Sequence, residues 1–409
     1  MRELAVHLYG ELVGNLVGES WRDFDFAISC AAIERFGLGS TVLSESVPLL
    51  ARQPRGKAAR RRNFFEELLP EGVIRQRLAE RARVESADTL GLLAEYGGDV
   101  AGAVKIFDTS REDPREVPRV SALSEAQVGE LLDDVAAFPL GNVPDYGKAS
   151  LAGVQEKVLL ARIDGHWAQC LNGYASTHIV KPVSRVYPDM IFNEEYGLRL
   201  ARAVGLVSYE SWIETFDGVD ALVIERYDRD SSVPGGRIHQ EDMNQVLGAS
   251  GVEKYQERGG KVSLRRIAEV LRRVHGDVGA SFLLEHVTLA VAIGNLDLHA
   301  KNLSLLHPPD GSISLAPAYD IVPLAHYPNI DSRMAMAING VYEFGKLTIG
   351  DLVAEAEAWG MSQGAAQDRI DHFLSRLYDA LTRETPHPRA HPTLVKSILE
   401  GPLWGPAAQ

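Results

Sequence analysis

Residues 158–182 read VLLARIDGHWAQCLNGYASTHIVKP, and this stretch decides the fold. Apolar residues on both sides of Asp164-Gly165 predict two strands, 158–163 and 166–171, joined by a tight hairpin turn. A third strand is predicted over the apolar residues that follow, and Pro182 ends it because proline has no N–H group to give to a sheet. The chain therefore builds a small antiparallel sheet here.

The elements after this sheet extend the pattern. A helix is predicted over 194–204, capped by Asn193 and ended by Gly205. Two more strands, 210–216 and 221–227, are joined by another Asp-Gly turn, and a mainly helical remainder follows. Three strands, one helix and two strands before a helical half is the element order of a protein-kinase amino-terminal lobe. The sequence thus predicts an α+β fold with two lobes, one a small antiparallel sheet with one helix and the other mainly helical.

The residues before the sheet form a unit of their own. Residues 4–17 have the alternation of a hairpin, and helical patterns follow, so a small α+β module is predicted over 1–108. Two prolines and mixed charges make 109–119 the best linker. We therefore expect an amino-terminal module, a kinase amino-terminal lobe over 121–236 and a helical lobe over 237–409.

The composition is that of an ordinary globular protein of 409 residues, with 45 % hydrophobic and 24 % charged residues. The net charge of -14 argues against a dedicated nucleic-acid coat. Two cysteines fit a reducing compartment, and no secretory signal or run of 18 apolar residues is present, so we expect a cytosolic protein that does not span a membrane. Four histidines show no metal-ligand spacing and receive no role: His275, His286, His307 and His326.

Phosphoryl transfer needs few kinds of residue, because its catalysis is mostly positioning and charge neutralisation. It needs a lysine on the third strand, a carboxylate on the following helix, a base and two metal ligands. Lys181 stands at the end of the third predicted strand. Either Glu194 or Glu195, at the start of the predicted helix, could pair with it, although acidic residues in a first helical turn are also ordinary partners of the helix dipole.

The strongest chemical signal is residues 295–302, NLDLHAKN, between an apolar helix and a predicted strand. Asp297 and Asn302 have the D-x-x-x-x-N spacing of a kinase catalytic loop, in which the Asp takes the hydroxyl proton and the Asn holds a metal ion. Asp320 follows a second predicted strand, at the place of a metal-binding carboxylate, and such oxygen ligands favour Mg²⁺. The simpler alternative is that these side chains only satisfy backbone groups at loop ends.

One kinase feature is missing, since no G-x-G-x-x-G loop precedes the first strand. Its place is taken by residues 147–157, GKASLAGVQEK. Backbone amides near Gly153 and the ammonium of Lys157 could grip phosphates, and a plain polar loop is an equally good interpretation of the spacing.

Six segments together resemble the HipA-type serine/threonine kinase toxins, a type II toxin–antitoxin family. They are Leu69-Pro70-Glu71-Gly72, residues 98–103 (GDVAGA), residues 150–157 (SLAGVQEK), Gln240-Glu241-Asp242-Met243, residues 295–302 and Tyr319-Asp320. The resemblance covers nearly the whole chain. It implies a two-lobed kinase-like fold, ATP and Mg²⁺ as cofactors, and a toxin–antitoxin setting in a bacterial cytoplasm.

The resemblance also implies roles for single residues. Asp297 matches the catalytic base, and Asn302 and Asp320 match the magnesium-binding residues. Ser150 matches a serine whose autophosphorylation expels the nucleotide-covering loop and switches the kinase off. The implied ATP-binding residues are Ala152, Gly153, Val154, Gln155, Glu156, Lys157, Lys181, Glu225, Arg226, Tyr227, His299 and Asn302.

By the same resemblance, the substrate is an aminoacyl-tRNA synthetase, with the glutamyl enzyme as the first choice. The expected partner is a separately encoded helix-turn-helix antitoxin, similar to HipB, which binds operator DNA. Two alternatives stay open at this point. One is a kinase of small molecules, and the other is a non-catalytic protein that holds nucleotide as the partner of a DNA-binding antitoxin.

Overall fold

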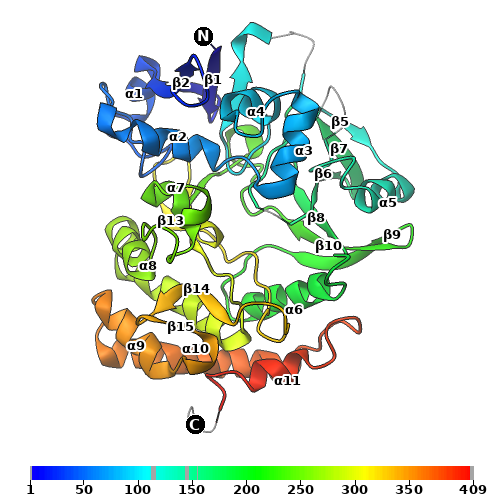
Figure 1. Cartoon of the computed structure of the whole chain (residues 1–409), viewed down its shortest axis with the longest axis vertical. Helices are drawn as coiled ribbons and strands as arrows, with labels where there is room; N and C mark the ends of the chain where they lie inside the picture. The colour runs from blue at the N-terminus through cyan, green and yellow to red at the C-terminus, as the bar shows by residue number, and fades with distance from the viewer. Residues whose placement is uncertain (1, 112–116, 143–146, 154, 406–409) are drawn as a thin grey trace.

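The computed structural model describes residues 2–111, 117–142, 147–153 and 155–405. Its amino-terminal part contains an antiparallel sheet in the order β3-β2-β1-β4 (Figure 1). The strands are β1 (Arg2–Leu8), β2 (Glu11–Gly18), β3 (Asp25–Ile28) and β4 (Lys105–Asp108). β1 and β2 turn at Gly10, whose φ of 85° is readily adopted only by glycine. The predicted first hairpin is confirmed.

Helices pack against this sheet and enclose an apolar core. They are α1 (Cys30–Phe36), α2 (Ala58–Glu66), α3 (Gly72–Ala82) and α4 (Thr89–Tyr96), with the short turns η1 (Arg55–Lys57) and η2 (Thr109–Arg111). Leu4 and Val6 from β1 meet Phe64 and Phe65 from α2 in that core, all fully buried. Burying such side chains, at about 1.5–3 kcal/mol each, is the main force that holds the module together.

The predicted sheet of the amino-terminal lobe is confirmed and gains an edge strand. Its order is β5-β7-β6-β8-β10-β9, with antiparallel pairing throughout the described strands. The strands are β5 (Arg119–Ala122), β6 (Val158–Ile163), β7 (His166–Leu171), β8 (His178–Pro182), β9 (Ser211–Phe216) and β10 (Val219–Glu225). Lys181 in β8 pairs with Leu222 in β10, and β8 lies between β6 and β10, which places the lysine near the middle of the sheet.

Two helices accompany this sheet, α5 (Glu125–Asp133) and α6 (Met190–Ala203). The prediction that Asn193 caps the second helix is wrong, because α6 begins at Met190, four residues before the predicted start, with Asp189 at its cap position. The Asn193 side chain is buried and donates instead to the Tyr327 hydroxyl at 2.7 Å. This earlier start places Glu194 inside the helix, where it is fully buried against the sheet side of the lobe.

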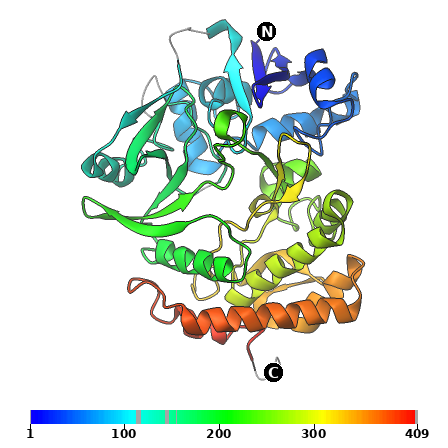
Figure 2. The same ribbon diagram turned by 180° about the vertical axis from the view of Figure 1, so that it is seen from behind.

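The carboxy-terminal lobe is mainly helical and lies below the sheets in Figure 2, with α10 (Gln363–Arg383) along its base. Its other helices are α7 (Met243–Leu247), α8 (Leu264–Ile293), α9 (Ile349–Ala358) and α11 (Leu394–Leu399), and its short turns are η4 (Gly251–Lys254), η5 (Ala300–Asn302) and η6 (Phe344–Lys346). The turn η3 (Pro234–Gly236) comes just before this lobe. Its strands are β11 (His239–Asp242), β12 (Ser304–His307), β13 (Ser314–Leu315), β14 (Arg333–Ile338) and β15 (Val341–Glu343).

Helix α8 is long and apolar enough to cross a membrane by composition, but 67 % of its most apolar window is buried inside the molecule. It also breaks at Gly276, whose φ of 63° and ψ of -152° are not helical. Residues from both halves, among them Ile267 and Leu283, belong to the largest apolar core of the protein. The helix is therefore the core helix of this lobe, and the catalytic-loop segment follows its carboxyl end.

A buried cluster of charges joins the amino-terminal module to the two lobes. Asp99, in the loop before β4, lies 2.8 Å from Arg229 and 3.3 Å from Arg237. Asp228 completes the cluster, since it lies 2.7 Å from Arg226 and accepts the Gly102 amide at 2.7 Å. Because ions removed from water need close partners, this cluster fixes how the three parts sit against one another.

Candidate active site

Lys181 holds two carboxylates together at the centre of the predicted site. Its ammonium lies 2.6 Å from Glu194 on α6 and 3.1 Å from Asp320. Sequence left Glu194 and Glu195 as equal partners, and the structure selects Glu194, because Glu195 turns outward to pair with Arg199. Burial opposes the charged form of Lys181, but Glu194 and Asp320 outweigh it and raise the pKa, so the lysine is fully charged.

Asp320 presents its carboxylate to the site from an unusual backbone. Its φ of 57° lies in the left-handed region, which costs a residue with a Cβ about 1–2 kcal/mol. Burial works against its ionisation, but Lys181 and Lys157 outweigh it and lower the pKa of Asp320 to about 2. The Asp320 side chain is 38 % exposed, whereas the Glu194 side chain is 0 % exposed. Asp320 is thus an ionised carboxylate that can still be reached.

The loop 295–302 is held closed by its own side chains. Asn302 donates its amide to the backbone carbonyl of Asp297 at 2.9 Å, and the His299 N–H donates to the same carbonyl at 2.8 Å. Asn295 accepts the Asp297 N–H at 3.3 Å and donates to the backbone carbonyl of Asp320 at 3.4 Å. These bonds join the two predicted catalytic segments, and they leave the oxygen of the Asn302 amide as the atom available to a cation.

Asp297 is a carboxylate whose proton affinity suits a general base. Burial, reinforced by the nearby charge of Asp320, raises its pKa to about 6, although Lys254 and Tyr255 act in the opposite direction. Its side chain remains 45 % exposed. A group with this pKa is mostly ionised at pH 7 and can accept a proton, which is the combination that acid–base catalysis favours.

His299 lies beside Asp297, with Nε2 3.8 Å from the carboxylate. Burial, with Lys254 adding to it, lowers the pKa of His299 to about 3, so the ring is neutral. The Tyr255 ring packs edge-on against it at 5.4 Å. The structure thus brings this predicted nucleotide-binding residue next to the predicted base.

The segment 147–157 lies over the site, with Val154 outside the described residues. Lys157 is buried and donates to the carbonyl of Ala152 at 3.0 Å. Burial and the neighbouring Lys181 lower the pKa of Lys157 to about 8, so the side chain is still mostly charged at pH 7. Gly153 has a φ of 116°, and a Cβ there would lie 2.8 Å from the Lys157 ammonium. The loop is therefore shaped around this cation.

Two further contacts tie the loop to the amino-terminal module. The Glu71 N–H donates to the carbonyl of Gly153 at 3.3 Å, and Arg77 pairs with Glu156 at 2.9 Å. Gln155 is half-buried between them.

Ser150, near the start of this loop, is completely buried. Its hydroxyl donates to the carbonyl of Leu68 at 3.0 Å, and its N–H donates to the carbonyl of Asp99 at 2.8 Å. In this conformation the hydroxyl is engaged with the amino-terminal module and cannot meet the Asp297 carboxylate. Any phosphate on Ser150 therefore requires the segment to leave its place.

The three consecutive residues Glu225, Arg226 and Tyr227, implied above as ATP-binding, lie where β10 ends. The Arg226 N–H donates to the carbonyl of Thr177 at 2.9 Å, and its guanidinium points away into the buried charge cluster. Glu225 accepts the Glu210 N–H at 3.2 Å. The Tyr227 ring lies 5.7 Å from the ring of Tyr319, the residue before Asp320. The end of β10 therefore contacts the segment that carries Asp320.

A group of charges that the sequence did not predict supports the loop 295–302. Lys301 is buried and lies 2.5 Å from Glu67 and 2.9 Å from Glu71, both in the amino-terminal module. Lys254, at the end of η4, reaches Glu71 at 3.1 Å. Glu71 lies in one of the quoted motifs, but Lys254 and Tyr255 lie in a stretch without any motif, and no signal in the sequence marks them.

The donor set fits a magnesium ion. Asp320 offers an ionised carboxylate and Asn302 an amide oxygen, and hard oxygen ligands of this kind are what Mg²⁺ prefers. Three cations, Lys157, Lys181 and Lys254, surround the same place, which suits the phosphates that such an ion accompanies.

Two family models match the chain. The HipA N-terminal domain matches residues 4–107, and the HipA-like C-terminal domain matches residues 149–381. A Sinorhizobium fredii protein named "Putative kinase Y4mE" is 32 % identical over 391 residues, 94 % of this chain and 92 % of that protein. The "Serine/threonine-protein kinase toxin HipA" of Shewanella oneidensis is 26 % identical over 393 residues, 92 % of this chain and 88 % of that protein.

A solved complex from Shewanella oneidensis contains HipA, HipB and operator DNA. The chain matches its HipA with a TM-score of 0.79 and 24 % identity, over 97 % of this chain and 94 % of that one. This match confirms the predicted fold class, a two-lobed kinase-like α+β fold with an additional amino-terminal module. With both family models matched in order along the sequence, the chain belongs to the HipA-type kinase family.

Proposed function

We propose that this chain is an ATP- and Mg²⁺-dependent serine/threonine protein kinase that acts as a toxin in a bacterial cytoplasm. The observation that carries the proposal is the buried Lys181 ammonium, held 2.6 Å from Glu194 and 3.1 Å from Asp320 beside a carboxylate of raised pKa, Asp297. A lysine–glutamate pair and a metal-binding carboxylate must both be in place for a protein kinase to work. Relatives named as kinases add support.

In the proposed reaction Asp297 orients a serine hydroxyl and accepts its proton as the serine oxygen forms a bond to the γ-phosphorus. The bond from the γ-phosphorus to the bridging oxygen breaks, and ADP leaves. Lys181 fixes the phosphates, and Lys157 holds the covering loop over them. Asn302 and Asp320 would hold Mg²⁺, which neutralises the charge that develops on the phosphate oxygens.

The same proposal divides the chain into three working parts, with the boundaries predicted from sequence. The amino-terminal module, 1–108, supports the catalytic loop through Glu67 and Glu71. The lobe 121–236 would hold the nucleotide between the loop residues 152–157, His299 and the main chain of Glu225, Arg226 and Tyr227. The lobe 237–409 supplies the base and the metal ligands.

The partners are proposed from the family. The Shewanella relative is named a toxin, and its solved complex contains HipB and operator DNA. We therefore expect a helix-turn-helix antitoxin similar to HipB to bind this chain and, through itself, operator DNA. The proposed substrate is an aminoacyl-tRNA synthetase, with the glutamyl enzyme first, whose phosphorylation would halt translation and growth.

The test is peptide mass spectrometry after incubation of the purified chain and Mg-ATP with a panel of aminoacyl-tRNA synthetases. Phosphate on a serine of one synthetase, absent with Asp297→Ala, would support the whole proposal. Phosphate on a small molecule but on no protein would favour the first alternative. ATP binding with no phosphate transferred would favour a nucleotide-holding partner of the antitoxin.

A further inference from the structure

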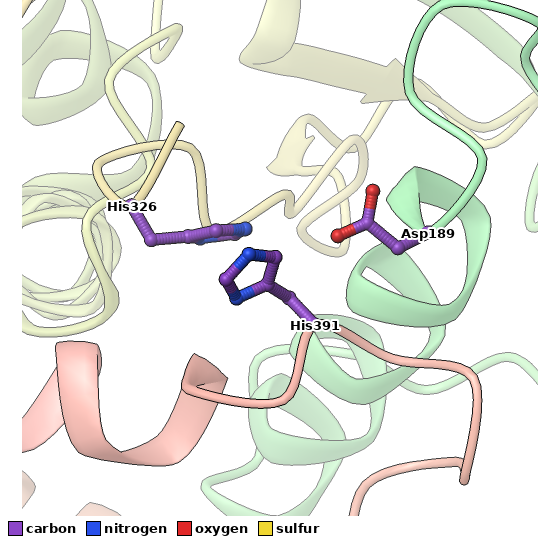
Figure 3. A group of neighbouring side chains, drawn as sticks. All are labelled: Asp189, His326 and His391. Carbon is purple, nitrogen blue, oxygen red and sulfur yellow. The ribbon is translucent and has the colours of Figure 1, made fainter. Parts of the chain in front are cut away.

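Three side chains far apart in the sequence meet outside the candidate active site. They are Asp189 at the start of α6, His326 in the segment after Asp320, and His391 between α10 and α11. The three point toward one another from three separate segments (Figure 3). Each offers one ligand atom, and these atoms lie within 4.8 Å of one another. We propose that Asp189, His326 and His391 bind a divalent transition-metal ion of the zinc type.

The Asn193 amide is shared among several neighbours at this place. The Asn193 amide nitrogen lies 2.7 Å from the Tyr327 hydroxyl oxygen, 3.3 Å from Asp189 and 3.3 Å from His326 Nε2. An amide has only two protons for these three acceptors. The amide cannot be turned over, because its oxygen accepts the His391 N–H at 2.9 Å. The Asn193 amide therefore does not bind all three atoms at once, and in the tautomer that carries its proton on Nδ1, His326 Nε2 is open to a cation shared with Asp189.

Both rings can take the form that binds a metal. Burial, together with the neighbouring His391 ring, lowers the pKa of His326 to about 4, so His326 is neutral at pH 7. His391 Nδ1 accepts the Thr393 N–H at 3.4 Å and lies 3.1 Å from the Thr393 hydroxyl; binding a metal through Nε2 requires Nδ1 to carry the proton instead and to donate it to that hydroxyl. Such a bond on the far nitrogen is the usual companion of a metal-binding histidine.

The Asp189 carboxylate also has lone pairs available to bind an ion. Asp189 occupies the cap position of α6, but its side chain accepts no backbone N–H of that helix end within the described structure. Its Oδ1 accepts the Tyr327 hydroxyl at 3.0 Å, which fixes the carboxylate and leaves lone pairs on both oxygens. Two histidines and one carboxylate, with a water in the fourth position, form a known zinc ligand set.

The three ligand atoms need to move only a short distance toward one another to bind an ion. Zinc ligands at about 2 Å from the ion lie roughly 3.3 Å from one another in a tetrahedron, so the three atoms would close by about 1.5 Å. The His326 and His391 ring centres are already 4.6 Å apart. His391 is carried by a segment that is held on α6, where His387 stacks on Phe192 at 4.5 Å.

A metal ion at this site would connect two segments of the candidate active site. α6 carries Glu194, and His326 follows Asp320 by six residues, so an ion at this site would tie together the two segments that hold Lys181. The third ligand comes from the carboxy-terminal segment, which would lock α6 from its outer side.

The 409-residue chain is first treated with a chelator to remove bound metal. It is then titrated with Zn²⁺ in the presence of a chromophoric chelator that competes for the ion. We expect one tightly bound ion per chain and none with Mg²⁺. His326→Gln and His391→Gln are each expected to weaken this binding by at least ~100-fold, because even the loss of an outer partner costs 10–100-fold. The matched control is His166→Gln, which replaces an exposed histidine at the start of β7 and should leave zinc binding like that of the wild type.

Two measurements keep the result separate from misfolding. Co²⁺ should give the visible absorption of a tetrahedral nitrogen–oxygen site in the wild type and in His166→Gln, and lose it in the other two variants. Circular dichroism without metal should be the same for all four proteins. Zinc affinity in His326→Gln and His391→Gln equal to that of the wild type would overturn the proposal, as would a wild type that binds no zinc.

Discussion

Lys181 binds both Glu194 and Asp320 in the candidate active site because its ammonium is buried and needs charged partners. A buried ammonium is costly unless it is paired, and Lys181 is paired twice, with Glu194 and with Asp320. The pairing leaves Asp320 ionised with a pKa of about 2 while Asp297, farther from that ammonium, has a pKa of about 6. Two neighbouring carboxylates with separated pKa values divide the work between a metal ligand and a base.

The first prediction concerns the base. Asp297→Asn should lower the turnover number for phosphoryl transfer by roughly 10² to 10⁴, since that is the usual contribution of a general base. The substituted amide keeps the size of the side chain, so Mg-ATP affinity should change little. Steady-state kinetics and calorimetric titration of Mg-ATP measure the two quantities, and near-normal turnover would remove Asp297 from its role.

The second prediction uses adjacent glutamates as a matched pair. Glu194→Gln removes one partner of a buried ion pair, a change that costs about 3–5 kcal/mol of unfolding free energy. Glu195→Gln removes an i,i+4 partner of Arg199 nearer the surface, worth about 0.3–0.5 kcal/mol. Denaturant unfolding of both variants should show this order, and phosphoryl transfer should fall only in Glu194→Gln. Equal effects would contradict the proposed pairing.

At the level of elements, the sequence predicted the strands well and the helix start poorly. Asp-Gly turns and Pro182 mark strand ends by backbone chemistry that is local, and the strands lie where expected. Asn193 resembles a helix cap, but tertiary contacts with Tyr327 override that preference and α6 starts at Met190. The bonds between Lys301 and the amino-terminal module join residues more than two hundred positions apart, which no local pattern records.

The third prediction concerns the covering loop. Ser150→Asp should expel the segment, because an unpaired carboxylate cannot occupy the buried place where the hydroxyl bonds Leu68. We expect faster hydrogen exchange over residues 147–153 and weaker Mg-ATP binding. Ser150→Ala loses one hydrogen bond, about 1 kcal/mol, and should keep the protection. Equal protection in Ser150→Asp would show that charge at this position does not move the loop.

The whole molecule should lose stability in mild acid because several histidines are buried as neutral rings. Burial lowers the pKa of His286 from its ordinary 6.5 to about 4, and neither ring nitrogen finds a partner among the described residues. His178 is lowered to about 4 and His239 to about 3 for the same main reason. At pH values between these lowered pKa values and 6.5, the unfolded chain binds more protons than the folded chain. The free energy of unfolding therefore keeps its full value above pH 6.5 and decreases as the pH falls toward 4.

The fourth prediction follows from that balance. Each fully buried ring should cost up to roughly 3 kcal/mol by pH 4, at about 1.4 kcal/mol per unit of pKa. His286→Leu removes one such ring from α8 and should flatten the pH dependence of the unfolding free energy by about one proton. Urea unfolding at pH 4.5 to 7.5 measures the slope. A slope in the variant as steep as that of the wild type would show that His286 does not titrate as proposed.

The central claim, that Lys181, Asp297, Asn302 and Asp320 form a phosphoryl-transfer site, is tested most directly by intact-mass spectrometry of the purified chain with Mg-ATP. We predict that the wild type gains one phosphoryl group, that peptide mapping places it on Ser150, and that Asp297→Asn gains none while still binding Mg-ATP. Phosphate gained equally by both proteins, or by neither while both bind Mg-ATP, would contradict the account.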